Sequence, residues 1–561
     1  MFVAIAFIFF VIFLRLGYIQ IVWGKKLQTR ALEQWTRDLP VTADRGDITD
    51  TNGIVFASSG TSYTVYVRPN SVSNHSLVAE LLSQALKLSY QDVYDKVTAK
   101  ISENTIKRKI TVEEANLIRS YNLEGVYVAA DTSREYVYGD FLSQVLGFVS
   151  SDNTGQSGLE AYYDKYLRGV DGAILTPSDL VGKELEGESA YYTPPVSGLN
   201  VVTTIDFRIQ RVVENVLDLV MQGHSPKGAR CIVVNPQTGE VLAMSSKPSV
   251  DLNNLPRDNI GELMASTKNM LITDVYEPGS TFKVLTAAAM LEEYARGNPK
   301  AHSASYVFPN NANFRIVDGS RVKCWTTHTS SKHCNQNLGD ALNNSCNPIF
   351  TDIGLSLGKE TMYKYLSAFG YGAVSGIDFA GEQAGLLVAE SAVTNGDLAR
   401  ISFGQTIAVT PLQLAMATSA AVNGGLLMQP YLVKEIRTQE GELVKKFYPT
   451  VRQRAISEKV SRELAGLLEN VVTNGSGKQA YIEGFKVGGK TGTAQKYENG
   501  HIAVGKYVSS FVGFFPADNP QYLALMLVDE PTGAHYGSTV AAPYAKMIFQ
   551  QIINYKNLKP A

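Results

Sequence analysis

A lysine lies three residues after a serine at the start of an apolar run, "EPGSTFKVLTAAAM", at residues 277–290. The preceding Pro278 and Gly279 suit a turn into a helix. Helical pitch then places Ser280 and Lys283 on one face, with their side chains adjacent. Because the following residues are apolar, this helix is expected to be buried, and burial lowers the pKa of a lysine amine. A fold for this chain must therefore bury an amine beside a serine hydroxyl.

The spacing alone is ambiguous, because a serine that caps a helix and a lysine that reaches solvent produce the same pattern. Two further motifs follow in chain order and make it specific. Residues 345–347 read Ser-Cys-Asn, an S-x-N motif, and residues 490–493 read Lys-Thr-Gly-Thr. S-x-x-K, S-x-N and K-T-G in this order form the motif set of serine acyl-transferases. The sequence therefore predicts one acyl-transfer site built from three distant segments.

Residue type predicts the role of each side chain at this site. Ser280 is expected to attack a carbonyl carbon, with Lys283 as the base that accepts its proton. Ser345 offers a hydroxyl that relays a proton to or from the leaving group, and Asn347 offers an amide that holds a substrate amide. Lys490 adds positive potential.

The third motif also predicts the substrate-binding strand. The hydroxyls of Thr491 and Thr493 suit a substrate carboxylate, and Gly492 allows close backbone approach along an edge strand. The seven histidines are scattered and no G-x-S-x-G motif is present, which argues against a Ser-His-Asp hydrolase. No cofactor is required for this chemistry.

The overall composition is that of a folded protein with several domains. A chain of 561 residues exceeds one ordinary core, and its hydrophobic fraction of 45% is typical of a globular protein. The 51 basic and 53 acidic residues nearly cancel, so nucleic acid is not an expected partner. Four cysteines are too few for a disulfide scaffold.

Residues 1–23 are predicted to form a transmembrane anchor. They carry one charged residue, Arg15, and are long enough to cross a hydrocarbon core of about 30 Å as a helix. The run ends in Trp23, followed by Lys25 and Lys26, without a signal-peptide cleavage site, which favours an anchor that is not removed. Taken alone, basic residues after the span would place the rest of the chain in the cytoplasm.

Two regions with different patterns follow the anchor. Residues 24–195 read as a mixed domain of strands and short helices, in which the segment "LVAELLSQALKL" has helical spacing, with one apolar stripe at Leu77, Leu81, Leu82 and Leu86. The turn-rich segment "EGESAYYTPPVSG" ends this region. Residues 196–561 are predicted to be one α+β domain, because a helix, a hairpin, a largely helical middle and closing strands follow one another.

The opening of the second region shows this pattern most clearly. The segment 204–223 is an amphipathic helix with Thr204 or Asp206 as its cap and Gly223 as its end. The segment 231–246 is a hairpin around a Pro-Gln-Thr-Gly turn, and Cys231 in its first strand is expected in the core.

The ordered motifs identify a resemblance that covers nearly the whole chain. The chain resembles a class B penicillin-binding protein of the Firmicute type, the monofunctional transpeptidase of bacterial cell-wall synthesis. Residues 45–57, "RGDITDTNGIVFA", are similar to the R-G-x-I-x-D-x-N-G signature that follows the anchor in that family. Residues 155–160 are similar to its G-x-x-G-L-E stretch.

The resemblance implies a D,D-transpeptidase that acts in cell elongation, cell division or sporulation. A peptidoglycan stem peptide would acylate Ser280 with release of D-alanine, an amine on a neighbouring strand would accept the acyl group, and β-lactams would acylate the same serine. The backbone N–H groups of Ser280 and Thr493 would form the oxyanion hole. The implied fold is an anchor, an elongated pedestal of the dimerisation type and a transpeptidase domain whose antiparallel sheet is flanked by helices.

The resemblance also implies a location and a partner. The catalytic domain would lie outside the cell membrane on a single-pass anchor. We give this implication of the resemblance more weight than the basic residues after the span, which alone would place the domain in the cytoplasm. A SEDS-type glycosyltransferase would be the membrane partner.

Two other classes share part of these motifs. A β-lactamase or a β-lactam sensor carries the same serine motifs, but the anchor and the long region before the motifs favour a synthase. Residues 484–491, "GFKVGGKT", match the phosphate loop of nucleotide-binding proteins, and "LMLVDE" at 525–530 resembles an acidic magnesium strand. That loop must be followed by a helix, and "GTAQKYENGHIAVG" has no helical pattern.

A cluster of cysteines and histidines surrounds the second motif and allows two interpretations. One is a disulfide between Cys324 and Cys334, which suits an extracytoplasmic protein. The other is a structural zinc site, since thiolates and imidazoles at short spacing are zinc ligands. The ligands predicted for zinc are Cys324, His333, Cys334 and Cys346.

His333 and Cys334 are adjacent, so both are difficult to use as ligands of one metal ion, and an acidic residue such as Asp340 is an alternative fourth ligand. His328 lies in the same segment. Because Cys346 lies between Ser345 and Asn347, a metal there would fix both side chains.

Overall fold

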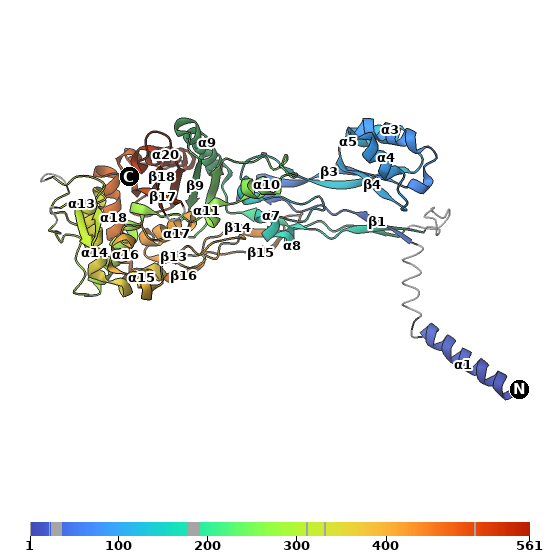
Figure 1. Ribbon diagram of the computed structural model, residues 1–561, viewed down its shortest axis with the longest axis horizontal. Coiled ribbons are helices and arrows are strands. Elements are labelled where there is room, and N and C mark those ends of the chain that lie inside the picture. The colour runs from blue at the N-terminus through green and yellow to red at the C-terminus, as the bar shows by residue number, and fades with distance from the viewer. Residues whose placement is uncertain are drawn as a thin grey trace.

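The computed structural model describes residues 2–21, 23, 36–177, 191–309, 312–329, 333–498 and 501–560. Outside α1, the described chain has two parts: a broad head of sheet and helices, and a long rod of extended strands (Figure 1). We call "head" the five-stranded sheet β10-β9-β19-β18-β17 with the helices that cover it, and "rod" the strands β1 to β8 with the β14–β15 hairpin.

The head is built on one antiparallel sheet. Its strands, in spatial order, are β10 (Val241–Lys247), β9 (Gly228–Val234), β19 (Tyr522–Asp529), β18 (His501–Phe515) and β17 (Gly488–Glu498). Every neighbouring pair is antiparallel. The β9–β10 hairpin and the β18–β19 pair are as predicted, and Cys231 is fully buried in the core. β17 lies at the edge of the sheet, and no other described strand pairs with its outer side.

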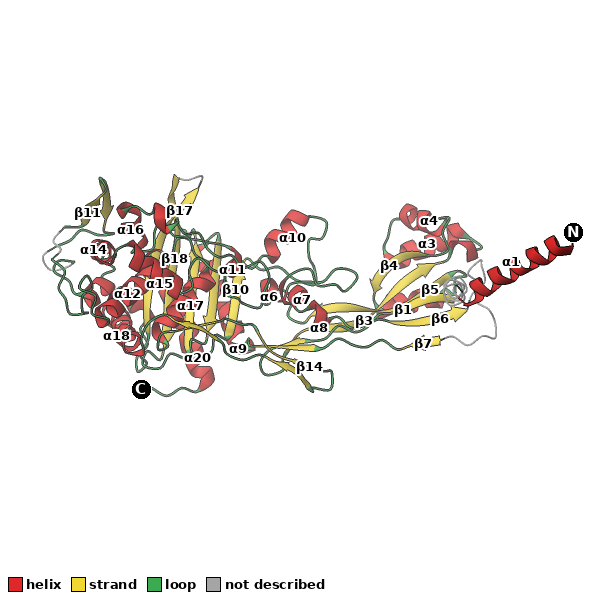
Figure 2. Cartoon of the chain, turned by 90° about the horizontal axis from the view of Figure 1, so that it is seen from below, coloured by secondary structure: helices red, strands yellow, loops and turns green. Residues whose placement is uncertain are grey.

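Helices cover both faces of this sheet (Figure 2). On one face, α9 (Phe207–His224) and α20 (Ala542–Lys556) share an apolar core with the sheet. The other face carries the larger core and most of the helices. These are α12 (Lys283–Ala295), α13 (Leu338–Asn343), α14 (Asn347–Leu357), α15 (Lys359–Ala368), α16 (Asn395–Ile401), α17 (Pro411–Val422) and α18 (Glu458–Asn474).

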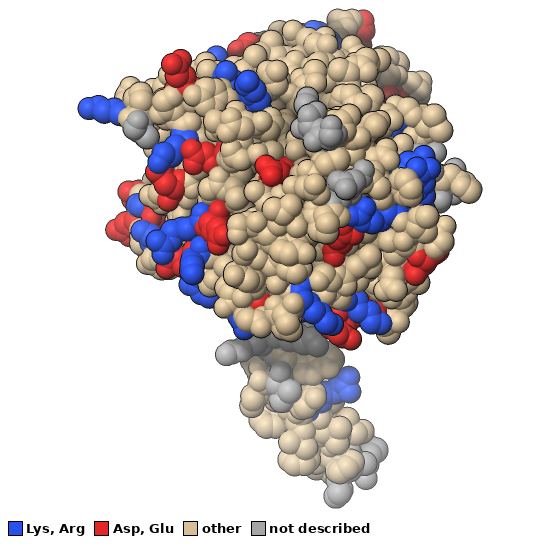
Figure 3. All heavy atoms as spheres, turned by 90° about the vertical axis from the view of Figure 1, so that its left-hand side faces the viewer, with Lys and Arg blue, Asp and Glu red and all other residues tan. Residues whose placement is uncertain are grey.

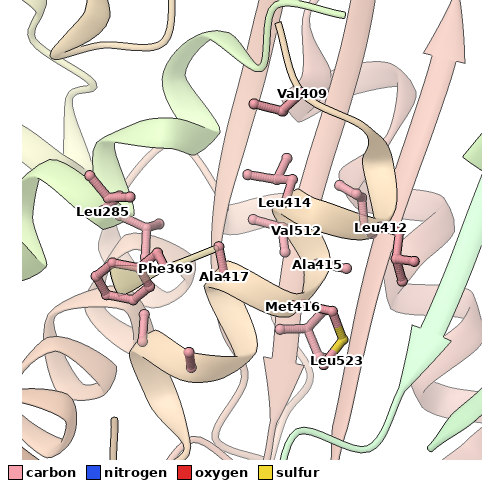
Figure 4. Packing of buried hydrophobic residues seen from close by; sticks show 14 of the residues in the cluster. Leu285, Phe369, Val409, Leu412, Leu414, Ala415, Met416, Ala417, Val512 and Leu523 are labelled. Atoms are coloured by element: carbon pink, nitrogen blue, oxygen red, sulfur yellow. The ribbon is translucent and has the colours of Figure 1, made fainter. Parts of the chain in front are cut away.

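Two of these helices show how the sequence specifies the packing. The side chain of Asp206 caps α9 by accepting hydrogen bonds from two backbone N–H groups, and the helix runs one residue past the predicted end at Gly223. Every residue of α17 is buried, and its apolar side chains lie against Val512 of β18 and Leu523 of β19 (Figure 4). The centre of the head is therefore a helix packed directly on the sheet.

Shorter elements complete the head. They are α10 (Ile260–Thr267), α11 (Met270–Thr273), β11 (Phe314–Val317), β12 (Ser320–Lys323), β13 (Leu426–Met428), β16 (Val451–Arg454) and α19 (Gly537–Val540). The face of the head turned away from the rod mixes basic and acidic side chains, in keeping with a net charge of −2 (Figure 3).

The rod is a second sheet that joins segments from far apart in the sequence. It comprises β15 (Leu443–Lys446), β14 (Val433–Arg437), β8 (Asn200–Thr203), β2 (Ile48–Thr49), β3 (Val55–Val67), β4 (Asn104–Ile110) and β5 (Val126–Tyr136). A three-stranded sheet of β1 (Thr36–Val41), β6 (Gly172–Pro177) and β7 (Tyr191–Thr193) lies in the same part.

The predicted boundary after residue 195 runs through this rod. β8 pairs with β2 on one side and with β14 on the other, so strands from both predicted domains share one sheet. The division into 24–195 and 196–561 stays a prediction. Strand sharing makes the junction between rod and head continuous, with short helices beside it: α6 (Ser143–Leu146), α7 (Gly158–Tyr162) and α8 (Asp164–Leu167).

A small helical lobe packs on β3, β4 and β5 of the rod. Its helices are α3 (His75–Leu86), α4 (Tyr90–Val97) and α5 (Val112–Ser120), and they enclose a separate apolar core. The predicted helix is present, and its apolar stripe is buried in part: Leu82 and Leu86 are buried, whereas Leu77 is 47% exposed. Val78 and Ala79 complete the buried face instead, since the helix turns that side toward the strands.

The N-terminal helix α1 (Phe2–Ile21) has 20 residues, and its large apolar side chains are exposed. Within the part of the chain that the structure describes, no helix is both long enough and apolar enough to cross a membrane. The anchor predicted for residues 1–23 is therefore not confirmed.

Candidate active site

The first motif lies at the junction of a turn and a buried helix. Ser280 is in a 3-10 turn (Gly279–Phe282), and Lys283 is the first residue of α12. Gly279 has a φ of +57°, which glycine adopts without strain, and its N–H donates to the carbonyl of Gly404 at 2.9 Å. The turn is thus held against the 404 loop, with the serine half-buried at its surface.

Lys283 lies below the serine and is fully buried. Its Nζ lies 3.0 Å from Ser280 Oγ, 2.7 Å from Asn347 Oδ1 and 2.8 Å from the carbonyl oxygen of Ser345. The predicted adjacency of hydroxyl and amine is therefore present. The amine also reaches Ser345 Oγ at 3.1 Å, so it contacts both serine hydroxyls of the motif set.

The second motif connects α13 to α14. Ser345 has a φ of +53°, a left-handed conformation that costs a non-glycine residue about 1 kcal/mol or more. This conformation aims its hydroxyl at the buried amines. Asn347 begins α14, and its Nδ2 donates to the carbonyl of Lys323 at 3.1 Å, which fixes the amide orientation that presents Oδ1 to Lys283.

The third motif lies on the edge strand β17. Lys490 Nζ donates to Ser345 Oγ at 3.0 Å, so Ser345 lies between the two lysines. A Cβ on Gly492 would meet the carbonyl oxygen of Pro278 at 3.1 Å and Ser510 Oγ at 2.4 Å. Glycine is therefore needed for β17 to approach the nucleophile turn this closely.

The two threonines of this motif lie on the same strand. The hydroxyl of Thr491 donates to Ser476 Oγ at 3.2 Å, and Thr493 Oγ1 accepts from the N–H of Gly537 at 3.1 Å. Ser476 lies in the loop after α18 and was not predicted from the sequence, since no local motif marks it.

The electrostatics of the site follow from two buried amines without a counter-ion. Lys283 and Lys490 are each 0% exposed, and no ion pair joins either to a carboxylate among the described residues. Burial lowers the pKa of Lys283 to about 8, and burial together with the charge of Lys283 lowers the pKa of Lys490 well below its usual range. Lys283 is therefore poised to accept a proton near neutral pH.

The nucleotide-binding alternative fails on the local fold. A phosphate loop must lead into a helix, whereas residues 488–498 form β17. The glycines that match the loop pattern instead allow close packing: a Cβ on Gly488 would lie 2.4 Å from the ring of Phe514.

The cysteine and histidine cluster lies directly behind the second motif. One ligand atom from each of Cys324, His328, His333 and Cys346 lies within 4.8 Å of every other. Cys324 Sγ is 4.0 Å from His333 Nδ1, and Cys346 Sγ is 3.7 Å from His328 Nε2. Hydrogen bonding between the two thiols lowers the pKa of Cys324 and raises that of Cys346.

The disulfide alternative is wrong in this structure, because Cys324 and Cys334 are both free thiols. The cluster differs from the predicted ligand set in one residue: His328 belongs to it, and Cys334 does not. Tetrahedral zinc with two sulfur and two nitrogen ligands needs ligand separations of about 3.3 to 3.8 Å. The four residues supply these donor types; the separation of Cys346 from His328 lies in this range at 3.7 Å, whereas that of Cys324 from His333 is longer at 4.0 Å.

Ser280 lies beside the buried amine of Lys283, the hydroxyl of Ser345 lies between Lys283 and Lys490, and all of them lie next to the edge strand β17. This arrangement is that of a serine acyl-transferase. The family described as "Penicillin binding protein transpeptidase domain" matches residues 229–553, and the "Penicillin-binding Protein dimerisation domain" matches residues 40–203.

Individual relatives agree with this assignment. The chain is 40% identical to "Stage V sporulation protein D" of Bacillus subtilis over 99% of this chain and 84% of that protein. It is 26% identical to "Peptidoglycan D,D-transpeptidase FtsI" of Escherichia coli over 97% of this chain and 89% of that protein. A solved peptidoglycan synthetase from Bifidobacterium adolescentis has the same fold, with a TM-score of 0.74 at 24% identity over 94% of this chain and 98% of that one.

The chain therefore belongs to the penicillin-binding proteins of class B, and it is a peptidoglycan D,D-transpeptidase.

Proposed function

We propose that the transpeptidase reaction proceeds through an acyl-enzyme on Ser280, with Lys283 as the base. The observation that carries this proposal is the 3.0 Å contact between Lys283 Nζ and Ser280 Oγ. In its neutral form the amine donates one hydrogen to Asn347 Oδ1 and one to the carbonyl of Ser345. Its lone pair then faces Ser280, whose hydroxyl donates to it.

The first half-reaction transfers the stem peptide to the serine. Ser280 Oγ bonds to the carbonyl carbon of the penultimate D-alanine, and its proton passes to Lys283. Ser345 lies between Lys283 and Lys490, so its hydroxyl passes a proton to the leaving nitrogen and takes up in its place the proton that Lys283 accepted from Ser280. The C–N bond breaks and the terminal D-alanine leaves. In the second half, an acceptor amine attacks the ester, loses a proton along the same path and restores Ser280.

The edge strand β17 holds the substrate during these steps. Thr491 and Thr493 present hydroxyls to the terminal carboxylate, and Lys490 donates a hydrogen bond to Ser345 beside them. The backbone N–H groups of Ser280 and Thr493 stabilise the oxyanion. Both assignments rest on the resemblance and on the closeness of β17 to the nucleophile turn at Gly492.

Mass spectrometry of the intact protein after penicillin treatment tests this assignment. We expect one adduct, mapped to the peptide that holds Ser280, which persists as the resemblance to a penicillin-binding protein implies. The Ser280→Ala variant should carry no adduct, whereas Ser305→Ala, an exposed serine outside the site, should label as the wild type does. An adduct on Ser280→Ala would overturn the assignment, and rapid loss of the adduct would favour a β-lactamase.

We also propose that Cys324, His328, His333 and Cys346 hold a structural zinc ion. Two thiols and two imidazoles that converge within 4.8 Å support this proposal, because zinc prefers this donor set. The ion would supply positive charge that keeps the thiols of Cys324 and Cys346 deprotonated, and it would hold the two sulfur atoms close together. It would fix Cys346, and with it the flanking Ser345 and Asn347, without taking part in the reaction.

Metal analysis of the purified full chain tests the zinc proposal directly. We expect about one zinc per chain, and chelation should lower the melting temperature by about 5 °C. His328→Ala should lose the metal, whereas Cys334→Ser should keep it, since Cys334 lies outside the cluster. A stoichiometry near zero under reducing conditions, or retention of zinc by His328→Ala, would contradict the proposal.

A location outside the cell membrane, with residues 1–23 as a single-pass anchor, is proposed from the sequence and the resemblance. The exposed apolar side chains of α1 support it. A SEDS-type glycosyltransferase is the proposed partner. Membrane fractionation should find the full chain in the membrane and a variant that starts at residue 24 outside it; equal distribution would contradict the anchor.

A further inference from the structure

A cavity of about 630 Å³ lies at the neck between head and rod. It is formed by α7, α8, the β14–β15 hairpin and the chain that follows this hairpin, all away from β17 (Figure 1). No residue of the three catalytic motifs lines it. Its walls are unusually aromatic, with Tyr162, Tyr163, Tyr166, Tyr431, Phe447 and Tyr448.

The aromatic rings form a fixed floor and an open rim. Tyr163 is 3% exposed, its hydroxyl donates to Asp378 Oδ2 at 2.6 Å, and its ring meets that of Phe447 edge to face. At the rim, Tyr448 is 67% exposed and Tyr162 is 47% exposed. Rings that stay open to water around a hollow suit a ligand with flat C–H faces, which the negative face of an aromatic ring attracts. Sugar rings have such faces.

The rim of the cavity also carries basic side chains. Lys165, Lys445 and Lys446 line it and are exposed. Lys446 is 3.4 Å from Glu435, whereas Lys165 and Lys445 form no ion pair within the described residues. Both of these free amines lie over aromatic rings, Lys165 over Tyr166 and Lys445 over Phe447.

The acidic groups near the cavity are already engaged. Asp378 accepts hydrogen bonds from the hydroxyl of Tyr163 and from the backbone N–H groups of Leu432 and Val433, at 2.6 Å and 2.9 Å for the latter two. Glu435 is paired with Arg437 and Lys446. The charge left at the rim is positive, so the complementary ligand is anionic.

We propose that this neck cavity binds a glycan strand whose stem peptides end in carboxylates. Sugar rings would stack on Tyr448 and Tyr162, and peptide carboxylates would contact Lys445 and Lys165. The cavity would then hold the polymer while one of its stem peptides reacts at Ser280. This proposal rests on the proposed function, because the same polymer supplies the reacting peptide.

Binding to the full chain with its active site blocked tests the proposal. Penicillin-acylated protein removes the contribution of the Ser280 site. The probe is a soluble tetrasaccharide of N-acetylglucosamine and N-acetylmuramic acid that carries stem peptides, measured by calorimetry. Tyr448→Ala should weaken binding about fivefold, through loss of one stacking ring. Lys445→Ala should weaken it about threefold and flatten its salt dependence.

Matched variants outside the cavity give the controls. Tyr192→Ala removes another exposed tyrosine, and Lys459→Ala another exposed lysine; both should bind as the wild type does. All variants should acylate with penicillin at the wild-type rate, which separates this proposal from the assignment of Ser280. Absence of binding by the acylated wild type, unchanged binding by Tyr448→Ala, or equal binding of a neutral chitin tetrasaccharide would each overturn the proposal.

Discussion

Two pairs of buried basic side chains, one in the rod and one at the active site of the head, differ in how their charge is compensated. In the rod, Arg45 and Arg134 both contact the carboxylate of Glu160, at 2.5 Å and 2.6 Å, and Arg45 also pairs with Asp164. In the head, Lys283 and Lys490 are buried beside serine hydroxyls. Among the described residues, no carboxylate forms an ion pair with either lysine.

The difference follows from what the two side chains are able to do. A guanidinium stays charged in proteins, so burying it requires a counter-ion, and the resulting pair fixes the structure. An amine that is buried without a counter-ion gives up its proton near neutral pH. The buried guanidinium groups of the rod therefore stabilise the structure, whereas burial at the active site makes an amine more able to act as a base.

The largest effect should come from replacing the buried amine of Lys283 by a guanidinium group like those buried in the rod. Lys283→Arg replaces the amine by a group that does not deprotonate, so the acylation rate by penicillin should fall about 1,000-fold or more. Stopped-flow or gel-based acylation rates measure this. A control is Lys459→Arg, on the exposed face of α18, which should leave the rate unchanged. Acylation of Lys283→Arg within tenfold of the wild type would show that Lys283 is not the base.

A smaller effect, on stability alone, should come from breaking the pairing in the rod. Glu160→Gln leaves two buried guanidinium groups without their shared carboxylate, and the free energy of unfolding should fall by about 3 kcal/mol. Denaturant unfolding measures the loss, while the folded fraction should acylate at the wild-type rate. An unchanged unfolding midpoint would mean that the rod cluster contributes no net stability.

The smallest effect is expected where a charge pair lies at the surface. Lys486 and Asp518 are 47% and 58% exposed and form an ion pair of 3.0 Å. Water screens such pairs, so Asp518→Asn should shift the melting temperature by less than about 2 °C. A loss of stability as large as that of Glu160→Gln would mean that burial does not explain why the two ion pairs differ in strength.

The predicted adjacency of Ser280 and Lys283 and the predicted convergence of the three motifs are both present in the structure. Residue spacing fixes the first, although Ser280 lies in a 3-10 turn ahead of the α-helix. The left-handed φ of Ser345 was not predicted, since no residue type in the motif requires it.

Features made by distant segments were predicted less well. His328, and not Cys334, lies in the cysteine and histidine cluster, because side-chain direction in an irregular loop depends on contacts such as that of Trp325 with the carbonyl of Asn344. The apolar stripe of α3 did not show that Leu77 is exposed, since the sequence does not say which side of the helix faces the rod. The neck cavity has no sequence signature, since its lining comes from residues as far apart as Tyr162 and Thr450.

The pH dependence of penicillin acylation tests the central claim most directly. The pKa of Lys283 is lowered to about 8 by burial, and only the neutral amine accepts the proton of Ser280. The second-order rate constant should rise about tenfold per pH unit below pH 8 and level off above it, while Lys283→Arg should show no such rise. A rate constant that is flat between pH 6 and pH 9, or that falls as pH rises, would contradict a lysine base.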